Sequence, residues 1–168
     1  MNNKKLFTLT SLLMIVAFVV AACGGTATTE APAATVEPTE VPEVVGGFQI
    51  PTIEEGKFNV AMVLIGPHDD GGWSQAHYEG LLYTEQNVPD THVAYIELVP
   101  EGADSEQVFR SLARKGFDLI IGTSFGYMDP MEIVAGEFPD SMFIHLTGFK
   151  TNGTNYGNMF GAMEVFKY

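Results

Sequence analysis

The stretch GPHDDGGWSQAH, residues 66–77, gathers most of the side chains in this chain that could perform chemistry. It holds two carboxylates, a glycine pair, two histidines and the only tryptophan, directly after an apolar run. Such a set could form a metal site, a phosphate cradle, a hydrolytic centre or a ligand-binding loop. The spacing of the residues separates these alternatives.

A metal site in this stretch would use His68, Asp69, Asp70 and His77. Their spacing matches no familiar zinc motif. We therefore expect a solvent-exposed His68 and a packed His77, with no metal and no cofactor. A phosphate-binding loop is also not indicated, because the glycine pair lacks the GxGxxG pattern and no P-loop lysine follows it.

A hydrolase would need an activated nucleophile, for which Ser74 and Ser124 are available. Neither serine lies in a G-x-S-x-G motif, and no histidine is placed to be recognised as its base. The adjacent Asp69 and Asp70 are not a glycosidase pair, since those carboxylates face each other across a substrate. The sequence therefore predicts a protein that is not an enzyme.

A binding loop uses each residue of the stretch naturally. Trp73 offers a flat π-face for a planar ring, and Asp70 can accept hydrogen bonds from a ligand. Gly71 and the glycine after it let a ligand approach the backbone, and free amides at a helix start can donate to it. The alternative stays open that Trp73 is a core residue and Asp70 only caps a helix.

The flanking sequence predicts strands alternating with helices. An apolar run at 58–65 is typical of a buried strand, and helical spacing follows from about residue 72 to 86. A second strand is expected at 92–99. Asp104 with Gln107 resembles a capping box, so we expect a helix from there that ends at Gly116.

The second half of the chain repeats this alternation. A third strand is expected at 117–121, a fourth at 142–146 and a fifth near 155–160, with a helix beginning at Gly161. Asp129 followed by proline predicts another helix start, with Asp129 as N-cap. On that helix Ile133, Val134 and Phe138 are expected to face inward, and Pro139 to stop it.

This alternation is typical of an α/β fold with a parallel sheet and helices on both faces. Ligands of such sheets bind at the carboxyl ends of the strands. Loops 66–74 and 122–129 both follow strands, so we expect them at the same edge. The second loop adds Thr123, Ser124, Phe125 and Tyr127 as candidate ligand contacts. Its polarity could alternatively be ordinary, with Phe125 packed under the sheet.

The N-terminus predicts export. Residues 1–22 combine Lys4 and Lys5 with an apolar segment and small residues, which is a secretory signal pattern. The Val-Ala-Ala-Cys ending resembles a bacterial lipobox, although Val20 stands where leucine is commoner. Cys23, the only cysteine, is therefore expected to be lipidated and to anchor the protein to a membrane face. An ordinary cleaved signal is the alternative.

Residues 23–47 are rich in Thr, Pro and Glu and predict a flexible linker, and residues 48–168 predict one folded domain. The chain carries a formal net charge of −13. An acidic chain with few Lys and Arg argues against nucleic acid as a partner.

Several motifs together resemble the basic membrane lipoprotein (BMP) family of purine-nucleoside receptor type. They are GPHDDGGWSQAHYEG, VPEGADSEQVFRSLARKGFDLIIGTSFGYMDP, FPDSMFIHLTG and NYGNMFGAMEVFKY. The resemblance covers residues 58–168 in order. It implies a substrate-binding lipoprotein of an ABC importer, which delivers a purine nucleoside or purine base, or in one branch a flavin, to an ABC transporter permease.

The resemblance also implies a fold and site roles. The family has two Rossmann-like lobes of the type I periplasmic-binding-protein kind that close over ligand. Asp70 matches the acid that begins the family's loop, Trp73 the stacking aromatic and Ser74 the polar residue after it. Residues 122–127 match the loop that lines the cleft.

The family's members are considerably longer, so we expect this chain to carry the first lobe only, with the second lobe and its stacking aromatic absent from it. Two other functions stay open at this point. One is a receptor domain that senses the same ligand without transport, and the other is a nucleoside-processing enzyme.

Overall fold

The structure is a computed structural model that describes residues 43–159. The expected signal segment, Cys23, most of the linker and the expected helix from Gly161 lie outside the described residues. Within 43–159 no helix is long and apolar enough to cross a membrane.

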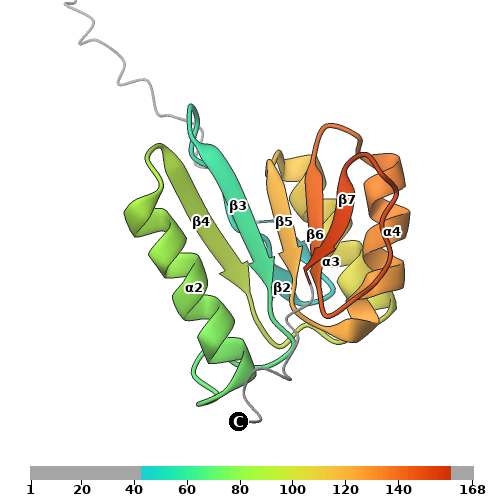
Figure 1. Cartoon of the computed structure of the whole chain (residues 1–168), viewed down its shortest axis with the longest axis horizontal. Coiled ribbons are helices and arrows are strands. Elements are labelled where there is room, and N and C mark those ends of the chain that lie inside the picture. The colour runs from blue at the N-terminus through green and yellow to red at the C-terminus, as the bar shows by residue number, and fades with distance from the viewer. Residues whose placement is uncertain (1–42, 160–168) are drawn as a thin grey trace, which may run out of the picture. The chain divides into compact units, whose positions relative to one another are not determined.

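Five parallel strands form the central sheet, in the order β4-β3-β5-β6-β7 (Figure 1). Their bounds are Phe58–Val63 for β3, Thr91–Ile96 for β4, Leu119–Gly122 for β5, Met142–Leu146 for β6 and Tyr156–Met159 for β7. The first strand, β3, is central because its sequence is apolar on both faces: five of its six residues are buried. The chain moves from β3 to β4 in one direction and then returns across β3 to β5.

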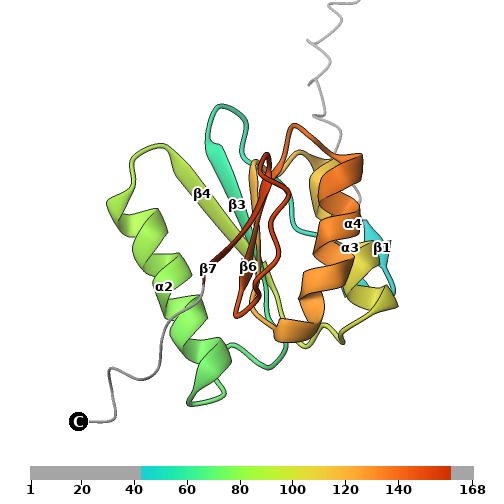
Figure 2. The ribbon, with the colours of Figure 1, turned by 45° about the vertical axis from the view of Figure 1, so that its right-hand side comes forward.

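That change of direction places the helices on opposite faces of the sheet. Helix α2 (Trp73–Asn87) covers one face, while α3 (Ala103–Lys115) and α4 (Met128–Glu137) cover the other (Figure 2). Right-handed crossovers require this arrangement, since a crossover leading the opposite way along the sheet must pass on the opposite side. The predicted α/β fold with helices on both faces is confirmed.

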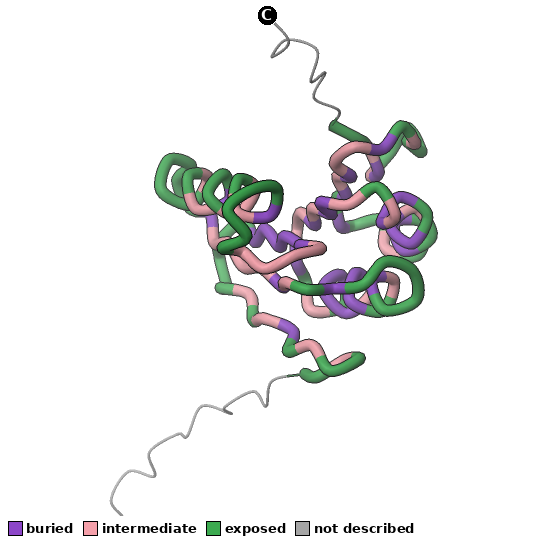
Figure 3. The backbone as a smooth tube through the Cα atoms, turned by 90° about the horizontal axis from the view of Figure 1, so that it is seen from below, coloured by how far each residue is buried: buried purple, intermediate pink, exposed green. Residues whose placement is uncertain are grey.

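The period of two along β3 divides the core into two clusters. Ala61 and Val63 face α3 and α4 and belong to the larger cluster. Val60, Met62 and Leu64 face α2 and form the smaller cluster with Leu81. Figure 3 shows the difference, since α3 and α4 carry buried turns while α2 is largely exposed.

Three of the expected helix details are wrong. Helix α3 begins at Ala103 with Gly102 as N-cap, so Asp104 lies in the first turn and caps nothing. Helix α4 begins at Met128, before Asp129, because the 3-10 turn η2 (Phe125–Tyr127) runs directly into it. Ile133 points outward and is 51% exposed. The expected end of α3 is confirmed, with Gly116 left-handed at φ 98°.

A short hairpin precedes the central sheet. Strands β1 (Val44–Val45) and β2 (Phe48–Gln49) pair antiparallel around a two-glycine turn. Val45 and Phe48 pack against the larger core cluster. Ile50, which follows the hairpin, is buried in the same cluster, and its amide donates a hydrogen bond of 2.8 Å to the main-chain oxygen of Glu43.

Candidate functional site

The loop after β3 is organised by the Asp70 carboxylate. Its Oδ1 accepts hydrogen bonds from the amides of Gly72 at 2.8 Å and Gln75 at 3.0 Å, and its Oδ2 accepts one from Ser74 at 3.0 Å. Amides at the start of a helix have no partner within the helix, so these can donate to the carboxylate. Their hydrogen bonds lower the pKa of Asp70 to about 2. Gly71 makes the turn possible with φ 70°. Asp70 therefore fixes the first turn of the helix.

Trp73, the first residue of α2, is held at the carboxyl edge of the sheet. Its indole Nε1 donates a hydrogen bond of 2.7 Å to the main-chain oxygen of Thr123 in the loop after β5. The His77 ring packs against the indole with centroids 4.3 Å apart. Trp73 nevertheless stays 42% exposed. The result is an accessible aromatic surface with a fixed orientation.

The loop after β5 is held by two residues from other strand ends. Glu101, in the loop after β4, accepts hydrogen bonds from Ser124 Oγ at 2.5 Å and from the Gly126 amide at 2.9 Å. The Nε2 of His145, in β6, lies 2.6 Å from the main-chain oxygen of Ser124. Phe125 between them is 58% exposed. Side chains from four strand ends thus meet at this one loop.

His145 is a neutral imidazole with a defined tautomer. Its partner is a carbonyl oxygen, so Nε2 must carry the proton. Burial lowers the pKa of His145, because the charged form would be desolvated. Its Nδ1 has no hydrogen-bond partner among the described residues. A Cβ at Gly148 would lie only 1.7 Å from that nitrogen, so glycine is required there.

Three of the predicted ligand contacts are buried and face the core. Ser74 is fully buried, and its Oγ accepts a hydrogen bond from the Gly66 amide. Thr123 is fully buried, and its hydroxyl donates to Val63 O. Tyr127 is also fully buried, and its hydroxyl donates to the Val99 carbonyl at 2.5 Å.

Each of these three hydroxyls satisfies a main-chain group inside the fold, and the assignment of the three residues as ligand contacts stays a prediction. The exposed predicted residues are Asp70, Gly71, Trp73 and Phe125, and Ser124 is half-buried.

The sequence interpretation missed Glu101 and His145. Glu101 directly follows the second strand region, so the rule that placed loops 66–74 and 122–129 at one edge also applied to it. His145 is the polar residue of an otherwise apolar strand, MFIHL. Two non-glycine residues just beyond strand ends at this edge also have positive φ, Leu98 at 59° and Thr147 at 73°. Such strain gathers at functional sites.

The histidines do not form a metal site, and within residues 43–159 no group of His, Cys, Asp and Glu is arranged to hold a metal ion. His68 is half-buried rather than exposed as expected, since its Nδ1 lies 2.8 Å from Glu97 Oε2 and its ring contacts Tyr78 and Tyr95. Hydrogen bonds from His68 lower the pKa of Glu97.

Ser124 is not an activated nucleophile in this arrangement. Its hydroxyl is bonded to the Glu101 carboxylate, while His145 contacts its carbonyl oxygen instead of its hydroxyl. A Ser–His pair requires the imidazole to accept the hydroxyl proton. The edge therefore offers aromatic surface and polar contacts for binding.

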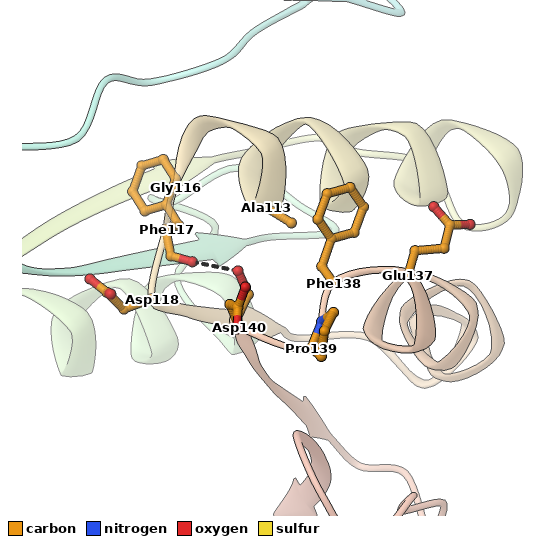
Figure 4. Close-up of a pocket in the computed structure, with 9 residues that line it drawn as sticks. Ala113, Gly116, Phe117, Asp118, Glu137, Phe138, Pro139 and Asp140 are labelled. Carbon is orange, nitrogen blue, oxygen red and sulfur yellow. Dashed lines mark hydrogen bonds between the residues drawn. The ribbon is translucent and has the colours of Figure 1, made fainter.

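A hollow of about 320 Å³ lies at the opposite edge of the sheet, between the ends of α3 and α4 (Figure 4). Its polar groups are largely used within the protein: Asp118 accepts from the Asn59 amide, Ser141 donates to Phe117 O, and Glu137 binds Arg110. It is the amino edge of the strands, where ligands of such sheets do not bind.

A comparison of the sequence with known protein families agrees with the observed fold. The family model for PnrA-like ABC transporter substrate-binding proteins (Bmp) covers residues 57–168. The chain belongs to this family. Members of the family bind substrates for ABC transporters, and the described residues correspond to roughly one lobe of such a protein.

Two curated relatives carry ligand names. A purine-binding protein of Brucella abortus is 43% identical over 98 residues, which is 58% of this chain. A Haloferax volcanii protein, named as a glucose-binding protein of an ABC transporter, is 38% identical over 110 residues, which is 66% of this chain. The chain spans 28% of the length of each relative.

Solved structures agree on the fold. An ABC transporter solute-binding protein from Conexibacter woesei matches with a TM-score of 0.54 at 23% identity, over 61% of this chain and 34% of that chain. A solute-binding protein from Aeropyrum pernix also gives 0.54, at 20% identity, over 60% of this chain and 28% of that one. These matches place the five-stranded sheet within the solute-binding-protein fold.

Proposed function

We infer that this chain is the first ligand-binding lobe of an extracytoplasmic ABC-transporter protein, and that its ligand is a purine base or nucleoside. The observation that carries this proposal is the half-exposed indole of Trp73. It is fixed by its bond to Thr123 and lies in the same set of strand-end loops as the exposed Phe125. A planar aromatic ligand stacks well on such a surface, typically with about 1–3 kcal/mol per base.

The two relatives' names suggest different ligands, and the site favours the purine. A glucose site would rely on several polar side chains that point at hydroxyl groups. Here Ser74, Thr123 and Tyr127 bury their hydroxyls, and the Asp70 oxygens already accept three main-chain bonds. The exposed surface is therefore mainly aromatic, with Ser124 and Glu101 as polar neighbours.

Each exposed residue receives a role in this proposal. Trp73 is the stacking platform, and Gly71 lets the ligand approach the backbone. Asp70 keeps Trp73 in place by fixing the first turn of α2. Phe125 and Ser124 line the second side of the site. A second lobe closes over the ring by hinge motion and a permease receives the ligand, with Cys23 as the lipid anchor.

The alternative is a sensory receptor that binds the same ligand without transport, and a permease gene beside this one would favour transport. A nucleoside-processing enzyme is less well supported, because the imidazole of His145 contacts the carbonyl oxygen of Ser124 and not its hydroxyl.

Isothermal calorimetry tests the ligand class. Adenine, adenosine, guanosine, inosine, riboflavin and glucose are titrated separately into this chain and into the complete reading frame that contains it. Saturable heat with a purine and none with glucose supports the proposal. Saturable heat with glucose alone contradicts it, and so does silence with all six ligands in a protein shown to be folded. Chromatography of the solution recovered from the calorimeter's sample cell detects any reaction product formed from the ligand, and such a product would indicate an enzyme.

A further inference from the structure

The edge of the sheet that carries Trp73 is also the edge at which the helices begin. Helices α2, α3 and α4 start there because they follow the carboxyl ends of β3, β4 and β5. The first amides of a helix have no partner within it and, together with the helix dipole, favour anions such as phosphate. In this lobe carboxylates of the chain itself occupy such positions, and this bears on which purines the site accepts.

The start of α2 is occupied by Asp70. Its two carboxylate oxygens accept hydrogen bonds of 2.8 to 3.0 Å from the amides of Gly72, Ser74 and Gln75. A phosphate at this helix start would have to displace the carboxylate from the same donors. The charge of Asp70 is also largely compensated, since three amides point at it.

The turn that leads into α4 is occupied by Glu101 in a similar way. Its Oε1 accepts hydrogen bonds from the Gly126 amide at 2.9 Å and from Ser124 Oγ at 2.5 Å. Glu101 is exposed, so its charge faces solvent at this edge. The indole of Trp73 is bonded to Thr123, the residue before Ser124. A ring that stacks on Trp73 would therefore lie beside the Glu101 carboxylate.

Positive charge is scarce at this edge. Among residues 43–159, Lys150 is the only Lys or Arg in the loops that follow the strands of the central sheet. Its Nζ lies 2.8 Å from Asp129 Oδ1 and 2.6 Å from Glu132 Oε2, so its charge is compensated within the lobe. Helix α3 carries Asp104 and Glu106 in its first turn. The described part of this edge therefore offers a phosphate acidic surroundings and no uncompensated cation.

We propose that Glu101 is a specificity-determining residue that makes the site reject purines carrying a phosphate group and accept uncharged ones. The proposal rests on the purine-binding function proposed above. A phosphomonoester carries about 1.5 to 2 negative charges at pH 7, and the carboxylate of Glu101 repels them. Binding sites commonly gain specificity by placing a repulsive group against the wrong ligand.

Calorimetry on the complete reading frame tests this proposal. The ligand pairs are adenosine with adenosine 5′-monophosphate and inosine with inosine 5′-monophosphate, in about 20 mM and about 500 mM salt. The measured quantity is the Kd of the phosphate divided by the Kd of its nucleoside. Glu101→Gln is the test variant, because a carboxamide oxygen can still accept the bonds from Ser124 and Gly126 but carries no charge. Glu55→Gln is the matched control, since it removes an exposed carboxylate that precedes β3, at the opposite edge.

We expect each nucleoside to bind the unmodified protein at least about tenfold more tightly than its phosphate at low salt. Glu101→Gln should narrow this ratio about fivefold, which is the change in Kd that one pair of unit charges about 4 Å apart in water would cause. The ratio in the unmodified protein should also fall at high salt, because salt screens repulsion between exposed charges. Glu55→Gln should leave the ratio unchanged.

Nucleoside binding with an equal ratio in the unmodified protein and Glu101→Gln would overturn the proposal and leave the purine function standing. A ratio that stays constant or rises with salt would also overturn it, and this measurement needs no variant, so it decides the matter even if Glu101→Gln fails to fold. Binding of purine bases without nucleosides would show exclusion by size, which overturns it too. Absence of all purine binding in folded protein would contradict the purine function itself and this proposal with it.

Discussion

The indole nitrogen of Trp73 donates a hydrogen bond of 2.7 Å to the main-chain oxygen of Thr123, fifty residues further along the chain. This bond joins the loop after β3 to the loop after β5, two strands that are neighbours in the sheet. It explains how a large aromatic side chain can be 42% exposed and still have a fixed orientation. A preorganised platform lowers the entropy lost on binding, since the side chain is already ordered.

The lowered pKa of Asp70 predicts that the free energy of unfolding falls in acid. Its pKa is about 2 in the folded protein against an ordinary 3.8, so it stabilises the fold above pH 3.8 and this contribution is lost as pH falls toward 2. We expect Asp70→Asn to weaken the pH dependence of the free energy of unfolding in this window, because asparagine still accepts a bond but does not titrate there. Urea unfolding at pH 7, 4, 3 and 2.5 measures it.

The control for this experiment is Asp69→Asn, which changes the adjacent exposed carboxylate. We expect it to leave the difference between pH 4 and pH 2.5 as in the unmodified chain. If Asp70→Asn and Asp69→Asn behave alike, the capping role of Asp70 is wrong.

Gly126 predicts that the loop after β5 is held by Glu101. A Cβ at Gly126 would come within 2.2 Å of the Glu101 carboxyl carbon. We expect Gly126→Ala to displace the Glu101 side chain and to raise amide hydrogen exchange at residues 124–126 about tenfold, because a net hydrogen bond of roughly 1–1.5 kcal/mol is lost. Glu101→Ala should have the same effect.

Gly136→Ala is the matched control, since a Cβ at Gly136 would have no neighbouring atom within 4 Å and the residue lies inside α4. Alanine there should raise the free energy of unfolding by about 0.5–1 kcal/mol through helix propensity and leave exchange in the loop unchanged. Unaltered exchange in Gly126→Ala and Glu101→Ala would show that Glu101 does not order the loop.

The backbone conformation of Leu98 predicts that this residue lowers the stability of the fold. It has φ 59° and is 56% exposed, so its strain is not offset by deep burial. We expect Leu98→Asn to raise the free energy of unfolding by about 0.5–1 kcal/mol, because asparagine tolerates the left-handed region better. Thermal and urea unfolding measure the change. Val88→Asn, at an exposed extended residue, should give no gain, and a loss in Leu98→Asn would mean that its packing outweighs the strain.

The sequence allowed the sheet and its functional edge to be predicted, because both depend on patterns that are local along the chain. Continuous apolar runs marked the strands, and the polar loops after them marked the carboxyl edge. The direction in which each side chain of those loops points depends on tertiary contacts and could not be predicted from the local sequence. Tyr127 and Ser74 resemble binding residues in sequence, yet their hydroxyls satisfy the Val99 carbonyl and the Gly66 amide inside the fold.

The start of α4 was mispredicted for a related reason. Asp129 followed by Pro130 is a strong cap signal, but Tyr127 already has helical dihedral angles because η2 leads into the helix. The tertiary bond from Tyr127 to Val99 holds that turn and overrides the local preference. Glu101 was missed although its position after a strand was visible, since the loop around it has neither the aromatic residues nor the glycine pair that mark the loop after β3.

The most direct test of the binding account is quenching of the intrinsic fluorescence of Trp73, the only tryptophan, by adenine and adenosine in the complete reading frame. We expect saturable quenching in the unmodified protein and in Tyr83→Ala, which removes a 66% exposed aromatic from the same helix. By calorimetry, Trp73→Ala should bind purine about 5- to 150-fold more weakly, which corresponds to the loss of one stacking contact of about 1–3 kcal/mol. Unchanged purine affinity in Trp73→Ala would contradict the account.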